Sequence, residues 1–288
     1  MVSIYIDTNV FLDFYQSATD RMGIFQELRA RVDCIVVPEQ TVREFRRNRA
    51  ARLIHLANQV EKSANVNVHT TAIVRELPDF KKWVEARDAV KNHARTIATQ
   101  LRTWARDESS DPVYQEFVKL YVHGTTMSTP NDALAKAQAR KLLGDPPTSP
   151  DKHTVGDEVI WETLLALCGN DLIIVSRDRT FLDNESLLRS DFNIDGKRRL
   201  LAVTDSLGQA LKLVGKPSTP IEQAEKEEIQ REAEARKALE SGRCPKCDVE
   251  MEEEGYEGGE GDSAWWLTCP KCNLLAFPVR EYEGAKGE

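Results

Sequence analysis

Long hydrophobic runs are missing from the chain, which excludes a helical membrane protein. Its longest apolar stretches, such as residues 34–37 and 173–175, are no longer than about six residues, whereas a membrane-spanning helix needs about 20. The N-terminus also lacks the basic segment and the following apolar segment of a secretory signal. We therefore expect no membrane partner and a cytoplasmic location.

Basic residues are outnumbered, but only in one part of the chain. The net charge is −8, with 47 acidic and 39 basic residues among 288. Residues 221–288 carry 18 acidic and 9 basic side chains, so residues 1–220 have a net charge of +1. Because phosphates respond to local basic patches, the overall acidity does not exclude nucleic-acid binding. Hydrophobic residues make up 41% of the chain, which is enough for a folded core.

Cysteines are few and unevenly placed. Cys34 and Cys168 lie in apolar segments and are expected to be buried thiols. The other four form two Cys-Pro-Lys-Cys pairs separated by 21 residues: Cys244, Cys247, Cys269 and Cys272. Without an export signal, this spacing predicts a metal site rather than disulfides. Four thiolates complete a tetrahedral site, so we expect a zinc ribbon with structural Zn²⁺, whose hairpin includes strands near 265–268 and 275–279.

Strand-like and helix-like segments alternate at both ends of the first 214 residues. Strands are expected over residues 3–6, 34–37, 171–176 and 200–204, and helices over 10–32, 39–61, 157–168 and 205–214. This order predicts an α/β fold with a parallel sheet flanked by helices. Residues 76–150 break the alternation and are expected to form an α-helical insertion, with helices near 77–107, 112–121 and 131–143.

Four acidic residues occupy positions that such a sheet would bring together. Asp7 directly follows the first strand and Asp178 follows a later one, and the carboxyl ends of parallel strands share an edge where ligands bind. Asp157 lies in the first turn of the helix that leads to the later strand, and Glu44 lies on the helix after the second strand. The four carboxylates are therefore expected to converge.

Each acid also has a local explanation when it is taken alone. Asp7 and Asp157 are good helix N-caps, and Asp178 is suited to a turn. Glu44 could pair with Arg47 or Asn48 on its own helix. The combination of the four positions, rather than any one acid, favours a functional site.

Four short motifs around these acids resemble those of PIN-domain nucleases: IYIDTNV at 4–10, VREF at 42–45, GDEVIW at 156–161 and VSRDRTF at 175–181. With its helical insertion, the chain is similar to an uncharacterised bacterial PIN subfamily, fused here to a C-terminal zinc ribbon. The resemblance implies a PIN-like nuclease domain over 1–214. Composition and cysteine spacing predict two further parts, a linker and charged helix over 215–241 and the zinc ribbon over 242–283. An acidic, glycine-rich loop is expected at 252–262.

The resemblance implies an endoribonuclease that hydrolyses RNA phosphodiester bonds with Mg²⁺ or Mn²⁺. The residues expected to bind the metal and act in catalysis are Asp7, Glu44, Asp157 and Asp178, with Asn9 and Ser176 supporting them. The chemistry is reasonable because clustered carboxylates repel one another without a cation, and hard divalent ions prefer oxygen ligands. A bound ion lowers the pKa of water and neutralises charge on a phosphodiester.

Basic side chains surround one of the four acids. Arg43, Arg46, Arg47 and Arg49 lie on the same predicted helix as Glu44 and form a candidate nucleic-acid surface. A solvated helix face would have the same composition. The sequence favours RNA through the resemblance and leaves DNA open.

Other functions remain open at this stage. The chain could be a non-cleaving nucleic-acid- or protein-binding scaffold with a PIN-like fold, although none of the four acids is lost. The acidic segment 252–262 could also cover the basic face and keep a real nuclease latent. The zinc ribbon could bind a protein partner or a second copy of the chain.

Overall fold

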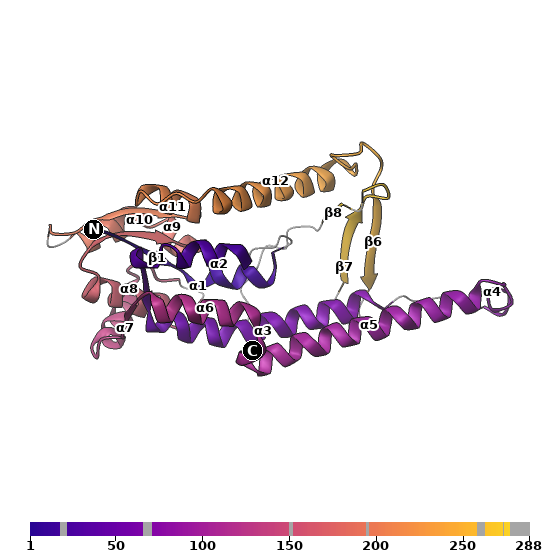
Figure 1. The fold of residues 1–288 in the computed structure, drawn as a ribbon, viewed down its shortest axis with the longest axis horizontal. Helices are drawn as coiled ribbons and strands as arrows, with labels where there is room; N and C mark the ends of the chain where they lie inside the picture. Colours follow the sequence, from indigo (N-terminus) through magenta and orange to yellow (C-terminus); the bar gives the residue numbers. More distant parts are fainter. Residues whose placement is uncertain are drawn as a thin grey trace. The chain divides into compact units, whose positions relative to one another are not determined.

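The structure of the protein, a computed structural model, describes residues 1–17, 22–65, 71–149, 152–193, 196–257, 263–272 and 274–276. The chain forms two compact units (Figure 1). The first consists of residues 1–52 and 104–225, and the second of residues 53–103 and 226–288. None of the helices in the described ranges has an apolar stretch long enough to cross a bilayer.

The first unit contains a five-stranded parallel sheet in the order β3-β2-β1-β4-β5. Its strands are β1 (Val2–Ile6), β2 (Ile35–Pro38), β3 (Thr125–Met127), β4 (Asp171–Val175) and β5 (Leu200–Thr204). The central strand β1 lies beside both β2 and β4, with Ile6 opposite Val175 at its end. The residues that follow β1 and β4 therefore start from neighbouring points on one edge of the sheet.

Helices cover both faces of this sheet, which confirms the predicted α/β fold class. The helices of the first unit are α1 (Thr8–Leu12), α2 (Met22–Arg29), the start of α3 (Glu39–Ser63), α6 (Pro112–His123), α7 (Ala133–Leu143), α8 (Gly156–Leu167), α9 (Arg179–Leu182), α10 (Glu185–Phe192), α11 (Leu207–Leu213) and the start of α12 (Thr219–Ser241). Ile173 lies in one core cluster with Phe117, whereas the next residue, Ile174, lies in another with Trp161. Neighbouring strand residues thus alternate between two buried faces, as expected for a covered parallel sheet.

The single helix predicted over residues 10–32 is wrong. Helix α1 ends at Leu12, a 3-10 turn follows over Asp13–Tyr15, and α2 begins at Met22. Residues 18–21 lie outside the described ranges. The rings of Phe11 and Phe25 stack with their centroids 6.1 Å apart. One continuous helix would separate them by about 21 Å along its axis, so burying both rings in one core requires the break.

The predicted helical insertion contains a strand that the sequence did not reveal. Within it, β3 pairs with β2, with Thr126 opposite Val37, and α6 buries Phe117 and Leu120 in the core of the sheet unit. The sequence Thr-Thr-Met is too short to show alternation, and it becomes a strand because β2 offers an edge for pairing. The remaining helices of this region, α5 (Phe80–Arg106) and α7, were expected.

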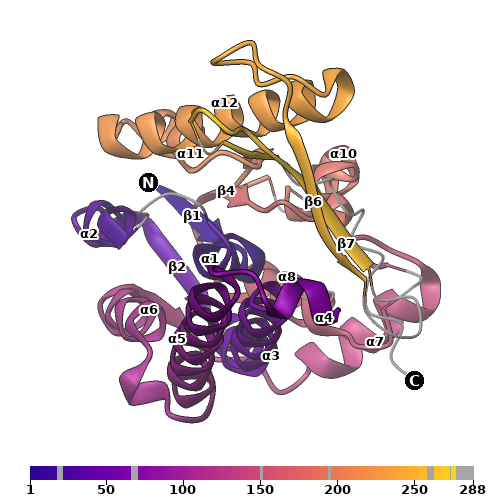
Figure 2. The ribbon, with the colours of Figure 1, turned by 90° about the vertical axis from the view of Figure 1, so that its right-hand side faces the viewer.

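The second unit contains a helical pair and the cysteine module. Residues 53–63 of α3 and the long helix α5 lie side by side (Figure 2). Arg102 on α5 forms a 2.6 Å ion pair with Glu61 on α3, and Ala57 and Ala98 are fully buried. The short helix α4 (Ala72–Arg75) lies between them in the sequence. Small buried residues allow two helices to approach closely, and the ion pair links these two helices.

The cysteine module is a three-stranded antiparallel sheet in the order β6-β7-β8. Strand β7 (Ser263–Thr268) covers the predicted strand near 265–268, and β8 (Leu275–Ala276) begins where the second was expected. The prediction of a loop over 252–262 is wrong for its first half, because residues 252–257 form β6 (Glu252–Glu257) and pair with β7. Residues 258–262 and 277–279 lie outside the described part of the chain.

Candidate functional site

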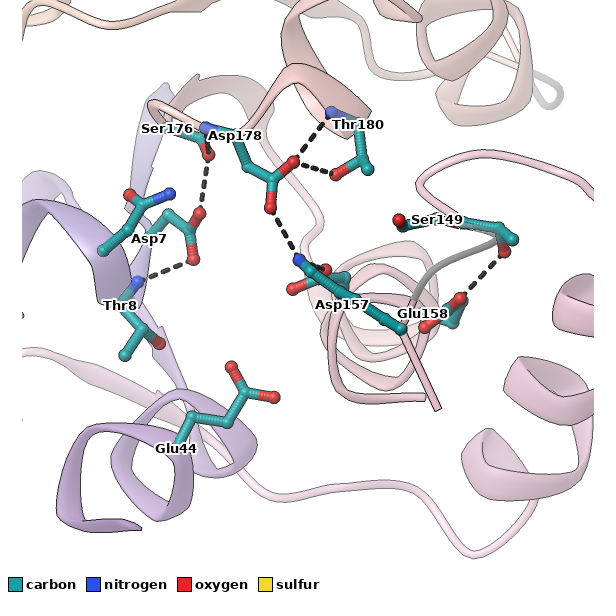
Figure 3. A network of polar contacts seen from close by, with 12 residues as sticks. Asp7, Thr8, Glu44, Ser149, Asp157, Glu158, Ser176, Asp178 and Thr180 are labelled. Atoms are coloured by element: carbon teal, nitrogen blue, oxygen red, sulfur yellow. Dashed lines mark hydrogen bonds and ion pairs between the residues drawn. The ribbon is translucent and has the colours of Figure 1, made fainter. Parts of the chain in front are cut away.

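The four predicted acids come from four elements of the first unit, and Figure 3 shows their side chains directed toward a common region. Asp7 follows β1 and caps α1, and Asp178 caps α9 after β4. Asp157 lies in the first turn of α8, and Glu44 lies on α3 after β2. The parallel arrangement of the strands thus brings together side chains up to 171 positions apart in the sequence.

Ser176 connects two of these acids. Its hydroxyl donates a 2.6 Å hydrogen bond to Oδ2 of Asp7, and its Oγ accepts a 3.0 Å hydrogen bond from the backbone N–H of Asp178. Ser176 is fully buried, so this link is shielded from water. Asn9, the other predicted supporting residue, accepts a 3.4 Å hydrogen bond from the backbone N–H of Arg177. Both residues therefore fix the segment after β4 against the start of α1.

Asp7 is a buried carboxylate in an environment that opposes its charge. Its Oδ1 accepts a 2.6 Å hydrogen bond from the backbone N–H of Thr8 and a 3.3 Å bond from the hydroxyl of Tyr5. Burial, followed by the charge of Asp157, raises the pKa of Asp7 to about 7, although the hydrogen bond from Ser176 acts in the opposite direction. An ionised Asp7 therefore needs a nearby cation.

Glu44 lies against the backbone at the start of α8. A Cβ atom added to Gly156 would lie 1.7 Å from Oε1 of Glu44, so only glycine leaves room for this carboxylate. The side-chain amide of Gln40 donates a 3.2 Å hydrogen bond to the same oxygen. Burial and the charge of Asp157 raise the pKa of Glu44. The sequence had shown Gly156 only as part of a motif, without this packing role.

Lys152 is the residue of the site that the sequence did not reveal. Its Nζ lies 2.7 Å from Oδ2 of Asp157 and 2.6 Å from Oδ2 of Asp178. Burial acts to raise the pKa of Asp178, but hydrogen bonds from Lys152 and Thr180 outweigh it, and the pKa lies below its usual value. For Asp157, burial outweighs the effect of Lys152, and the pKa is raised. One ammonium group is thus shared by two carboxylates.

The donor set fits a hard divalent cation. It consists of carboxylate oxygens that are largely withdrawn from water, and a positive side chain already lies between two of them. Oxygen ligands of this kind suit Mg²⁺ and Mn²⁺. Within the described ranges, only the four cysteines have all their ligand atoms within 4.8 Å of one another. The four described carboxylates do not form so close a group.

Three of the four predicted nucleic-acid-binding arginines lie on the surface of the first unit. Arg43, Arg46 and Arg47 are exposed on α3 near Glu44. Arg43 pairs with Glu39 at 2.7 Å, and Arg46 pairs with Glu108 at 3.0 Å. These contacts are exposed and weak, so they leave the guanidinium groups available to phosphates.

The prediction that Arg49 forms part of the nucleic-acid surface needs correction, because this residue is buried. Its side chain is 2% exposed and forms a 2.7 Å ion pair with the fully buried Asp111. It also donates a 2.9 Å hydrogen bond to the carbonyl oxygen of Trp104. Asp111 in turn accepts a 2.6 Å hydrogen bond from Tyr15 and caps α6. Arg49 therefore organises the core and is not placed to contact a substrate.

The four cysteines form the second candidate site, in the second unit. Their Sγ atoms all lie within 4.8 Å of one another, and those of Cys244 and Cys272 are 3.6 Å apart. The two pairs have the same backbone turn: the N–H of Cys244 donates to the carbonyl of Val249, and the N–H of Cys269 to that of Leu274. Four thiols in this arrangement could bind zinc as a closed tetrahedral site.

Backbone donors favour the thiolate form of one member of this cluster, Cys269. Burial acts to raise the pKa of Cys269, but backbone hydrogen bonds from Cys272 and Lys271 lower it to about 7. The N–H of Cys272 lies 3.4 Å from Sγ of Cys269. Because zinc binds the thiolate, these donors prepare Cys269 for the metal, whereas the neighbouring thiol of Cys272 raises the pKa of Cys247.

Comparisons with known proteins agree with the motifs. A family model described as the PIN domain matches residues 4–181, which is more than half of the chain and includes all four acids. Neither a search of curated proteins nor a search of solved structures found a match.

Proposed function

The chain belongs to the PIN-domain family, and from this premise we propose that it is an endoribonuclease that hydrolyses RNA phosphodiester bonds with Mg²⁺ or Mn²⁺. PIN domains are generally metal-dependent nucleases, so a nuclease-type function holds at the level of the family. RNA is proposed as the substrate because PIN-domain nucleases mostly cleave single-stranded or structured RNA.

The convergence of Asp7, Glu44, Asp157 and Asp178 is the observation that carries this proposal. We assign these four carboxylates to the catalytic metal site. A divalent cation bound there would activate water and neutralise charge on the phosphodiester. Ser176 holds Asp7 and Asp178 at fixed positions, which lowers the cost of assembling the site.

Each carboxylate has its own surroundings and therefore its own role. Oδ1 of Asp178 accepts hydrogen bonds from the N–H and the hydroxyl of Thr180, both at 2.8 Å, so its Oδ2 is the oxygen left for a cation. Glu44 is oriented by Gln40 and by the close approach of Gly156. We propose that Glu44 acts through water, either by contacting the metal ion through a water molecule or by orienting the attacking water molecule.

We propose that Arg43, Arg46 and Arg47 bind the phosphates that flank the cleaved bond. They lie on the helix that carries Glu44, and all three are exposed. Binding to phosphates releases counterions, so affinity for RNA should fall as salt rises. The zinc ribbon is proposed as a structural module that contacts a protein partner or the RNA.

The test is cleavage of labelled single-stranded RNA, structured RNA and single-stranded DNA by the full-length, zinc-loaded chain. We expect RNA cleavage that needs added Mn²⁺ or Mg²⁺ and is lost in Asp7→Asn and Asp178→Asn. Asp183→Asn is the matched control, because Asp183 is an exposed acid at the end of α9. Cleavage of DNA alone would revise the substrate. Absence of cleavage by folded protein would favour the scaffold function.

A further inference from the structure

The ammonium group of Lys152 occupies the oxygen atoms that a metal ion would need. It contacts Oδ2 of Asp178 at 2.6 Å and Oδ2 of Asp157 at 2.7 Å. The other oxygen of Asp178 is already engaged by the backbone N–H and hydroxyl of Thr180. The one oxygen of Asp178 that remains for a cation is therefore the one that Lys152 holds.

This contact differs from an ordinary surface salt bridge. The side chains of Asp157 and Asp178 are only 13% and 22% exposed, and Lys152 joins carboxylates from two different elements. Exposed lysines such as Lys82 and Lys136 instead pair with a single acid three or four residues away. Removal from water strengthens the attraction, and two acids that would repel each other share the positive charge.

Lys152 and a divalent ion cannot share these oxygens at low cost. Two cations held by the same carboxylates would repel each other strongly in a partly buried site. Lys152 lies in the irregular connection between α7 and α8, so its side chain can withdraw without displacing either helix. At 43% exposure, the side chain also has access to solvent when it leaves.

We propose that Lys152 is a built-in competitor of the catalytic metal ion, which holds Asp157 and Asp178 together in the metal-free protein and must leave before the ion binds. This inference rests on the proposed function, because it requires the carboxylates to bind a divalent cation. It assigns Lys152 a positioning role in the metal-free state. It also means that the metal concentration needed for activity is set partly by this side chain.

The test is the dissociation constant for Mn²⁺, measured by calorimetry and by electron paramagnetic resonance of free Mn²⁺ in full-length, zinc-loaded protein. If the ammonium occupies the site in about nine of ten molecules, Lys152→Met should bind Mn²⁺ about tenfold more tightly than the natural sequence. Lys152→Arg, which keeps the charge, should show no such gain. Lys136→Met removes an exposed lysine paired with Asp132 and serves as the control.

Melting of the metal-free proteins gives a second readout. Without its ammonium, Lys152→Met should melt at a lower temperature than the natural sequence, and Mn²⁺ should raise its melting temperature by more. If Lys152→Met does not fold, Lys152→Gln serves as the neutral variant in both measurements. An unchanged or weaker Mn²⁺ affinity in both Lys152→Met and Lys152→Gln overturns the inference. Such a result would indicate that the ammonium group of Lys152 remains in the site beside the bound metal ion.

The same experiment separates this inference from the proposed function. If the natural sequence binds Mn²⁺ and Asp178→Asn abolishes binding, the metal site stands whatever Lys152 does. If neither the natural sequence nor the Lys152 variants bind Mn²⁺, the metal site and the competition are both rejected.

Discussion

Gly156 and Glu44 are in such close contact that a single added methyl group would collide with the carboxylate. The Cβ atom of an alanine at position 156 would lie 1.7 Å from Oε1 and 2.9 Å from Cδ of Glu44. Glu44 lies on α3 and Gly156 begins α8, so the contact joins elements that are far apart in the sequence. The missing side chain of Gly156 therefore defines the position of one of the four proposed catalytic acids.

Gly156→Ala should impair the site more than the fold. Because the added Cβ forces Glu44 away, we expect RNA cleavage to fall by about 10²-fold, the loss that follows from displacing a catalytic group by about 1 Å. Cleavage rates and circular dichroism of the full-length protein measure the two effects. Gly23→Ala is the control, because nothing lies within 4 Å of its added Cβ. Full activity in Gly156→Ala would show that the position of Glu44 is not critical.

The metal-free protein should lose stability as the pH rises through neutrality. The pKa of Asp7 is raised from 3.8 to about 7, mainly by burial and then by Asp157. A raised pKa in the folded state means that the contribution of Asp7 to stability is fully present below pH 3.8 and is lost as the pH passes about 7. Burial raises the pKa of Glu44 and of Asp157 in the same direction. Thermal melting between pH 5 and 8, in buffer freed of divalent ions, measures this slope.

Asp7→Asn tests the origin of the slope. Asparagine cannot ionise, so the variant should show a flatter dependence of melting temperature on pH, while Asp183→Asn should match the natural sequence. Added Mn²⁺ should flatten the slope of the natural sequence as well, since a bound cation stabilises the ionised carboxylates. An equally steep slope in metal-free Asp7→Asn would assign the titration to other groups.

The acids at strand ends were predictable because their placement depends on local order along the chain. Asp7 and Asp178 directly follow strands, and a parallel sheet brings such residues to one edge. Lys152 offered no comparable signal, since it lies in an irregular connection and its contacts depend on how α8 is placed. Strand β3 was missed for the same reason, because its pairing partner β2 is distant in the sequence.

The burial of Arg49 could have been inferred from helix periodicity. Three residues of this helix are spaced by four positions: Thr41, Phe45 and Arg49. Each of them, measured over the whole residue, is at most 1% exposed. Residues four apart share one helix face, so the position of Phe45 marks Arg49 as inward-facing. Its charge suggested a surface role, but Asp111 supplies the buried partner that makes this position tolerable.

Replacing Arg49 should therefore unfold the first unit rather than weaken RNA binding. Arg49→Met leaves the buried carboxylate of Asp111 without its partner, and we expect a loss of about 3–5 kcal/mol in the free energy of unfolding. Denaturant titration measures this loss. Arg47→Met, at an exposed position on the same helix, should stay within about 0.5 kcal/mol but bind RNA more weakly and with a smaller salt dependence. Equal stability of the two variants would contradict the assigned role of Arg49.

Removing one thiol from the cysteine cluster should release zinc and loosen the C-terminal module without affecting the carboxylate site. The thiols belong to a small core in which Met251, Leu267 and Ala238 are buried, and in so small a module metal binding supplies much of the folding free energy. Cys269→Ser should lower the zinc content measured by mass spectrometry from about one ion per chain to near zero. Limited proteolysis should then cut the module faster.

Cys168→Ala is the matched control for zinc, because Cys168 is a buried thiol in the sheet unit. Its zinc content should equal that of the natural sequence. Mn²⁺ affinity should be the same in Cys269→Ser and the natural sequence, since all four proposed catalytic acids belong to the first unit. A loss of Mn²⁺ binding in Cys269→Ser would mean that the metal site depends on the ribbon. Retained zinc would mean that three thiols and a water molecule suffice, as in an open zinc site.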